Sequence, residues 1–285
     1  MKTFTSALLT AAAAFSVACV AQAADAPAKK PAAKKAAATK EYRAPPMEAS
    51  SKLPDWRGVW APHERNMFDP ASFTDPRNKG ITNAADMREY PPYNAEWEAK
   101  YVKVLADNKK GVPTDPHANC LPGGMPRTIV IPYPHEVVVT PKVTYWLLEE
   151  TSAVRRIFTD GRKHPVEEDF GHPFQGHSIG HWEGDTLVAD TVYMKDYNSS
   201  VFDVTAAPHS DKVHTVERIR RISPTQMEDI MTVEDPIAFT KPWVIRRLYD
   251  LKPTWEITEY ICEENNRNPL KADGSTTTGV VAQKN

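Results

Sequence analysis

The sequence has few cysteines, little glycine and no excess of charge of either sign. Its 285 residues include 3 Cys and 12 Gly, and the formal net charge is −2. Nucleic-acid binding depends on clustered cations that neutralise phosphates, so this charge balance argues against a nucleic-acid partner. The chain does have 41% hydrophobic residues and seven Trp, which are typical of a globular protein with a sizeable core.

Long apolar runs are missing outside the N-terminus. There, an apolar stretch over 7–20 follows Lys2, and a small-x-small cleavage pattern ends at Ala23. The pattern predicts a signal peptide over 1–23 and a periplasmic or secreted protein; a lipoprotein acylated at Cys19 is the alternative. The stretch is shorter than the roughly 20 residues that a membrane-spanning helix needs, so we expect no transmembrane segment.

Removal of the signal peptide would leave Cys120 and Cys262 as the only cysteines. In an oxidising compartment an even pair favours a disulfide, with two buried free thiols as the alternative. The glycines of CLPGGMPR (120–127) could suggest a phosphate-binding loop, but no Lys-Ser/Thr and no helix follow. We therefore interpret this segment as a bend anchored by the disulfide.

Composition divides the rest of the chain into four stretches. Residues 24–52 are rich in Ala, Lys and Pro and offer little to bury, which predicts a disordered tether. Its basic residues could make weak contacts with anionic envelope surfaces. We expect an irregular and helical segment over 53–126, a β-rich domain over 127–265 and a disordered C-terminal tail over 266–285.

One helix is expected, over 94–111. Its apolar residues recur at helical spacing, Asn94 can cap its start and Gly111 can end it. The apolar positions are Trp97, Tyr101, Val104 and Leu105. A helix with a single apolar face should pack against a larger element.

That larger element is expected to be all-β. From Arg127 onward nine short β-branched and aromatic runs recur at about ten-residue spacing. They are TIVI, HEVVVT, VTYWLLEE, AVRRIFT, DTLVADTVYM, KVHTVERIRRI, QMEDIMTVED, PWVIRRLYDL and TWEITEYIC. No helices intervene to connect parallel strands, so the runs predict an antiparallel meander that forms a barrel or half-barrel, lipocalin-like in outline.

The segment HPFQGHSIGHWEGDTLVADT (172–191) contains three histidines at the start of an expected strand. If 177–183 is extended, His177, His181 and Glu183 point to one side. They could transfer protons or bind Zn²⁺, but their spacing is not that of a known short metal motif. We therefore predict a catalytic role for His177 and no metal.

Carboxylates and an aromatic residue near His177 extend this candidate site. Asp190 lies among apolar neighbours, where an unpaired carboxylate is costly, so it should have a partner. Asp190 and Asp160 are the predicted acid/base partners of His177. Trp182 is a candidate substrate-binding residue.

The other substrate-binding candidates come from three places. In FTDGRKHP, Arg162 can clamp a carboxylate or phosphate and His164 lies beside it, with a solvated turn as the alternative. His209 is predicted in a loop, where binding residues are common. Glu259 shares a face with apolar residues of the last predicted run, whereas His214 is interpreted as a packed strand residue.

Four segments resemble a widespread family of exported, largely uncharacterised bacterial proteins. They are CLPGGMPR, RRIFTDGRKHP, GHSIGHWEGDTLVADT and EDPIAFTKPW, and the resemblance covers roughly 90–262. It implies a β-rich exported protein and carries over no catalytic residue. Similar sequences commonly have Arg in GRWEGDT where this chain has His181, which argues against an essential role for that histidine.

Three functions fit these features. The first is a periplasmic barrel that binds a small hydrophobic or aromatic molecule in its interior. The second is a cofactor-independent acid/base enzyme of the lyase, isomerase or hydratase type, which uses His177 with Asp and Arg partners. The third is a cell-envelope interaction protein that makes contact through the tether. None of the three requires a cofactor.

Overall fold

The computed structural model describes residues 53–63, 69–81, 87–112, 114–196, 201–203 and 205–262. The predicted signal peptide, the tether with its envelope contacts and the C-terminal tail lie outside the described residues. Within the described ranges, no helix has the length and apolar character needed to cross a membrane.

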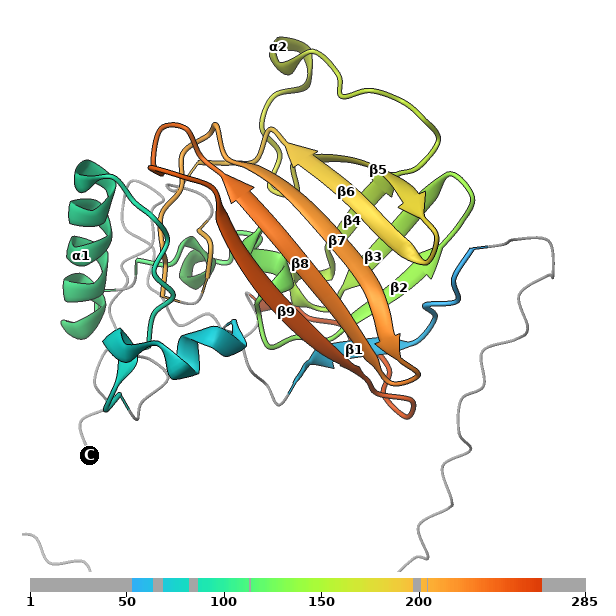
Figure 1. Cartoon of the computed structure of the whole chain (residues 1–285), viewed down its shortest axis with the longest axis horizontal. Helices are drawn as coiled ribbons and strands as arrows, with labels where there is room; N and C mark the ends of the chain where they lie inside the picture. Colours follow the sequence, from blue (N-terminus) through green and yellow to red (C-terminus); the bar gives the residue numbers. More distant parts are fainter. Residues whose placement is uncertain are drawn as a thin grey trace, which may run out of the picture. The chain divides into compact units, whose positions relative to one another are not determined.

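Nine strands close into a barrel (Figure 1). They are β1 (Val59–Pro62), β2 (His135–Val139), β3 (Val143–Leu148), β4 (Val154–Phe158), β5 (His177–Glu183), β6 (Thr186–Val192), β7 (His214–Ser223), β8 (Gln226–Glu234) and β9 (Trp243–Leu251). The strands follow one another in sequence order, and β1 pairs antiparallel with both β2 and β9 to close the ring. The prediction of an all-β barrel with a helix packed on it is confirmed.

Two of the nine predicted strands are wrong. TIVI lies partly in a short 3-10 helix, η6 (Arg127–Ile129), and its apolar residues are buried on all sides; a continuous apolar run of that length does not distinguish a strand from a buried turn. TWEITEYIC is irregular and largely exposed, because β1 already pairs with the free edge of β9. The two remaining places in the barrel are taken by β1, which comes from the segment expected to be irregular and helical, and by β5, which confirms the strand expected to begin at His177.

β4 and β5 pair in parallel, with Ile157 opposite Ser178, and this also differs from the predicted antiparallel meander. Parallel neighbours cannot be joined by a two-residue hairpin. The chain therefore makes a long connection over 159–176, which includes the short helix α2 (Glu167–Phe170) (Figure 1). Asp160 and Gly161 begin this connection. We call residues 159–176 the crossing loop.

Helix α1 (Ala95–Lys109) confirms the predicted helix. The Asn94 side chain accepts a hydrogen bond from the Trp97 N–H, and Gly111 follows the helix with a φ of 75°. Trp97 and Tyr101 are buried in a cluster that includes residues of β8, β9 and the irregular segments. The short 3-10 helices are η2 (Pro70–Thr74), η3 (Pro76–Asn78), η5 (Pro116–Asn119), η6 and η7 (Glu150–Ser152).

Large side chains fill the barrel interior around a buried ion pair. Trp60, Trp146 and Tyr249 are each no more than 1% exposed. Among them, the Arg155 guanidinium of β4 donates to the Glu217 carboxylate of β7, with Nη1 and Oε1 2.9 Å apart. Both charges are buried, and ions so far from water are stable only when paired and hydrogen-bonded.

The same ion pair has further partners on β6 and β8. Arg155 Nη2 lies 3.0 Å from the hydroxyl of Thr191. Burial, and then the neighbouring Glu217, raise the pKa of Asp229 well above its usual value. This shift favours the neutral form of Asp229 beside the ion pair. The ion pair and these neighbours come from four strands of the barrel.

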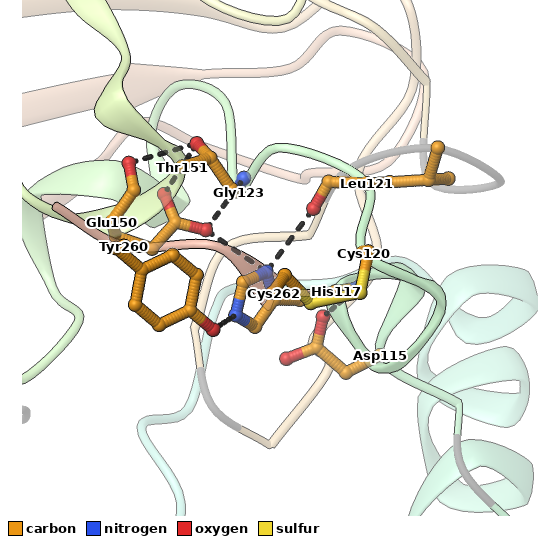
Figure 2. Close-up of a disulfide and its surroundings, with 9 residues drawn as sticks. All are labelled: Asp115, His117, Cys120, Leu121, Gly123, Glu150, Thr151, Tyr260 and Cys262. Atoms are coloured by element: carbon orange, nitrogen blue, oxygen red, sulfur yellow. Dashed lines mark hydrogen bonds and ion pairs between the residues drawn. A yellow bond between two sulfur atoms is a disulfide. The ribbon is translucent and has the colours of Figure 1, made fainter. Parts of the chain in front are cut away.

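A disulfide joins Cys120 to Cys262, as predicted, and is compatible with an oxidising compartment. Figure 2 shows the side chains around it. His117 Nδ1 is 2.9 Å from Oε1 of the buried Glu150, and the Tyr260 ring stacks on His117 at a centroid distance of 6.4 Å. The end of the described chain is thus fixed beside η5 and the bend that follows it.

Replacement of Arg155 by Met would leave Glu217 buried without its cation. We expect the free energy of unfolding to fall by about 3 to 5 kcal/mol, measured by urea denaturation. The double variant Arg155→Met with Glu217→Met removes both charges and should recover most of that loss. A double variant as unstable as the single one would contradict the ion-pair argument.

Candidate active site

A row of titratable side chains crosses the outer face of the barrel. His177 of β5, Asp190 of β6, His214 of β7 and Glu234 of β8 point outward, because their strand neighbours fill the interior. The fifth member, His164, comes from the crossing loop. It reaches the row because this loop must run from the end of β4 to the start of β5.

Hydrogen-bonding contacts connect the five side chains in one chain, which we call the relay. The Nδ1 atoms of His177 and His164 are 2.8 Å apart. Asp190 Oδ1 lies 3.1 Å from His164 Nε2 and 3.1 Å from His214 Nε2. His214 Nδ1 is 3.2 Å from Glu234 Oε2.

These contacts define how protons are placed when His177 and His164 are both neutral. Asp190 accepts from the Nε2–H of His164, so Nδ1 of His164 carries the lone pair. That lone pair accepts from the Nδ1–H of His177, which leaves Nε2 of His177 unprotonated. Nε2 makes no hydrogen bond with any residue that the structure describes. His177 can therefore accept a proton at this atom.

The pKa values favour this arrangement. Burial lowers the pKa of His177 below its ordinary value; His164, in the states in which it is protonated, and Arg162 lower it further. Burial raises the pKa of Asp190, but the hydrogen bonds and charges of His214 and His164 lower it more, so the net shift is downward. The hydrogen bond to Asp190 raises the pKa of His214. The relay thus joins a neutral histidine to an ionised carboxylate.

His177 lines a groove of about 430 Å³ with largely apolar walls. Phe158 stacks on the His177 ring with centroids 5.6 Å apart, and Phe170 meets the ring edge-on at 5.1 Å. Phe174 and Pro122 also line the groove. Small-molecule sites commonly have this form, a concave apolar surface with a few placed polar groups.

The structure brings three of the predicted site residues together: His177, Asp190 and His164. The other two candidates of FTDGRKHP pair with each other: Arg162 Nη2 and Asp160 Oδ2 form an ion pair at 2.6 Å, and the Arg162 guanidinium lies over the Phe158 ring. This pairing lowers the pKa of Asp160 to about 2. Asp160 therefore pairs with Arg162, the residue predicted to bind a carboxylate or phosphate of the substrate, and does not contact the relay.

The remaining predicted site residues lie apart from His177. Trp182 faces the barrel interior and packs against Trp56, with ring centroids 5.0 Å apart. His209 is fully buried and its Nδ1 lies 2.9 Å from the carbonyl oxygen of Ser210. Glu259 is exposed, and the strand face assigned to it does not exist, because TWEITEYIC forms no strand.

Sequence reasoning missed two relay members, His214 and Glu234. The two residues are paired across the β7–β8 hairpin. The available signal was that each residue alternates with apolar residues along its own run. This alternation predicts a contact between His214 and Glu234 only once the register between the two strands is known. The excluded candidate, His181, is exposed and lies 3.2 Å from Glu183.

Among the described residues, no group of three or more His, Cys, Asp or Glu side chains could hold a metal ion. Comparison with protein-family models and with curated proteins gives no match. The resemblance to exported bacterial proteins therefore stays a prediction, and the chemistry of the site has to be argued from its own geometry.

NMR titration of the histidine rings should separate His177 from His214. We expect His177 to titrate below 6.5 and His214 above it. The contribution of His214 to the free energy of unfolding is fully present below pH 6.5 and is lost as the pH rises through the raised pKa of His214 in the folded protein. The contribution of His177 is lost as the pH falls from 6.5 through the lowered pKa of His177 in the folded protein. Asp190→Asn should lower the pKa of His214. An unchanged value in this variant would contradict the contact.

Proposed function

We propose that this protein is a cofactor-independent acid/base enzyme of the lyase, isomerase or hydratase type. Its substrate would be a small, partly apolar molecule bound in the groove beside His177. One observation carries the proposal: a histidine with a lowered pKa lines an apolar groove and is connected through a second histidine to a carboxylate.

In this mechanism His177 takes a proton from the substrate at Nε2. Its Nδ1–H donates to His164, whose Nε2–H donates to Asp190, so the positive charge that develops on His177 is stabilised through the relay. His177 can then return the proton to another atom of the substrate. A base of this kind works best with a pKa close to the working pH, which suits a neutral imidazole.

The surroundings of His177 support proton transfer in two ways. Phe158 and Phe170 contact the ring on its face and its edge, which restricts its orientation. The same rings limit water around the reacting atom, and electrostatic interactions are stronger where the local dielectric constant is low. Positioned acid/base groups of this type commonly contribute about 10²- to 10⁴-fold to a rate.

The barrel interior is a second candidate site, for a bound hydrophobic or aromatic molecule. Buried polar atoms favour it: the indole N–H groups of Trp56 and Trp146 and the hydroxyls of Thr144 and Thr215 have no hydrogen-bond partner among the described residues. Buried polar groups normally have one, which a ligand or an internal water could supply.

The base-promoted ring opening of 5-nitrobenzisoxazole tests the first proposal, because it needs only a base beside an apolar surface. The base removes the C–H proton, the N–O bond breaks, and a coloured cyanonitrophenolate forms. We expect His177→Gln to lower kcat/KM by about 100-fold or more and Asp190→Asn by about tenfold, measured by absorbance.

His181→Gln is the matched control, since His181 lies on the same strand and the same face but outside the groove. It should change kcat/KM by less than about twofold. A rate for the unmodified protein no higher than that of free imidazole, or an equal loss in both histidine variants, would argue against His177 as a base.

Native and denaturing mass spectrometry test the interior site. A molecule retained in the barrel would add mass to the native spectrum only, and Thr144→Val with Thr215→Val should weaken its retention by removing two hydroxyl groups. A native mass equal to the denatured mass would contradict a tightly held interior ligand.

A further inference from the structure

We propose that the groove beside His177 binds a small aromatic or branched carboxylate, with Arg156 pairing with the carboxylate group. This inference names the substrate class of the site proposed above, and it rests on that proposal only for what His177 does to the bound molecule. It depends on four observations, which concern the position of Arg156, its lack of a partner among the described residues, the charges around the groove and its aromatic lining.

Arg156 points outward from β4, between two residues that face the interior. Arg155 and Ile157 are buried, whereas Arg156 is exposed and lines the groove. Parallel pairing sets Ile157 opposite Ser178, so one position earlier Arg156 lies beside His177 on the outer face. A molecule held by Arg156 would therefore lie next to the proposed base.

The Arg156 guanidinium is available to a ligand. It forms no ion pair or side-chain hydrogen bond with any residue that the structure describes. Other arginines of this region are already paired: Arg155 with Glu217, Arg162 with Asp160, and Arg127 with Asp115. A guanidinium has two parallel N–H groups that match a carboxylate, which makes it better suited to this group than to a single oxygen.

The charges around the groove favour an anion. Its described lining residues include no Asp or Glu, and Arg156 and His177 are its titratable members. By contrast, each of three other grooves on the described surface has at least one carboxylate in its lining. These carboxylates are Glu136 and Glu256, Glu234 and Asp235, and Asp196 and Asp211.

The apolar part of the groove determines the rest of the ligand. Phe158, Phe170 and Phe174 present aromatic surface within the same hollow as Arg156. A flat or branched apolar group would bury area against these rings while its carboxylate pairs with the guanidinium. Inorganic anions and sugars lack this apolar part and are expected to bind weakly.

Calorimetry with 3-phenylpropanoate and its neutral analogue 3-phenylpropanol tests the inference on the whole chain. The unmodified protein should bind the carboxylate at least tenfold more tightly than the alcohol. Arg156→Gln should lower the carboxylate affinity by about tenfold, with a much smaller change for the alcohol. Arg156→Lys keeps the charge and should lose less, and Arg218→Gln, an exposed arginine outside the groove, is the matched control.

Equal affinities for the two compounds, no carboxylate binding by the unmodified protein, or an equal loss in Arg218→Gln would each overturn the inference. Arg156 is exposed, so the melting temperature of Arg156→Gln should match that of the unmodified protein. Binding is measured without turnover. If His177→Gln leaves the ring-opening rate intact while carboxylate binding still depends on Arg156, the enzyme proposal fails and the carboxylate site stands. If His177→Gln abolishes the ring-opening rate while Arg156→Gln leaves carboxylate binding unchanged, the carboxylate site fails and the enzyme proposal stands.

Discussion

The parallel pairing of β4 with β5 is the constraint on which the rest of the site depends. Two adjacent parallel strands cannot be joined by a hairpin, so the chain leaves β4 and returns through the crossing loop. This return places His164 against His177 and Phe170 edge-on against the same ring. The same pairing sets Arg156 beside His177. An antiparallel connection would have left β5 without these neighbours.

The barrel could be predicted because most of its strands alternate between the interior and the outside, a pattern visible in the sequence. The helix was equally readable, since Asn94 caps it and its apolar residues share one face. Two runs misled the prediction for different reasons: TIVI is buried without being extended, and TWEITEYIC alternates but has no free strand edge to join. Which strand edges are free depends on how the barrel closes, and the residue pattern of a single run carries no information about that.

The site was only partly predictable for a related reason. Period two placed His177 on one face of its strand and Asp190 among apolar neighbours, where it needed a partner. The connection between them runs through His164, which belongs to an irregular loop. Arg162 was predicted to bind an anionic substrate group, but one of its polar sequence neighbours, Asp160, already pairs with it. Arg156 lies in the run AVRRIFT, and its place beside His177 depends on the register with β5, which that run alone does not contain.

Closure of the barrel by β1 and β9 also affects how the chain can fold. The two strands lie near opposite ends of the described sequence, so their pairing is among the least local contacts in the molecule. Contacts of this kind close large loops, and proteins rich in them fold slowly. A chain made from its N-terminus has to keep β1, with the fully buried Trp60, unpaired on its β9 side until the last strand exists. Until then the growing chain has an open strand edge, the kind of surface that favours association with other chains.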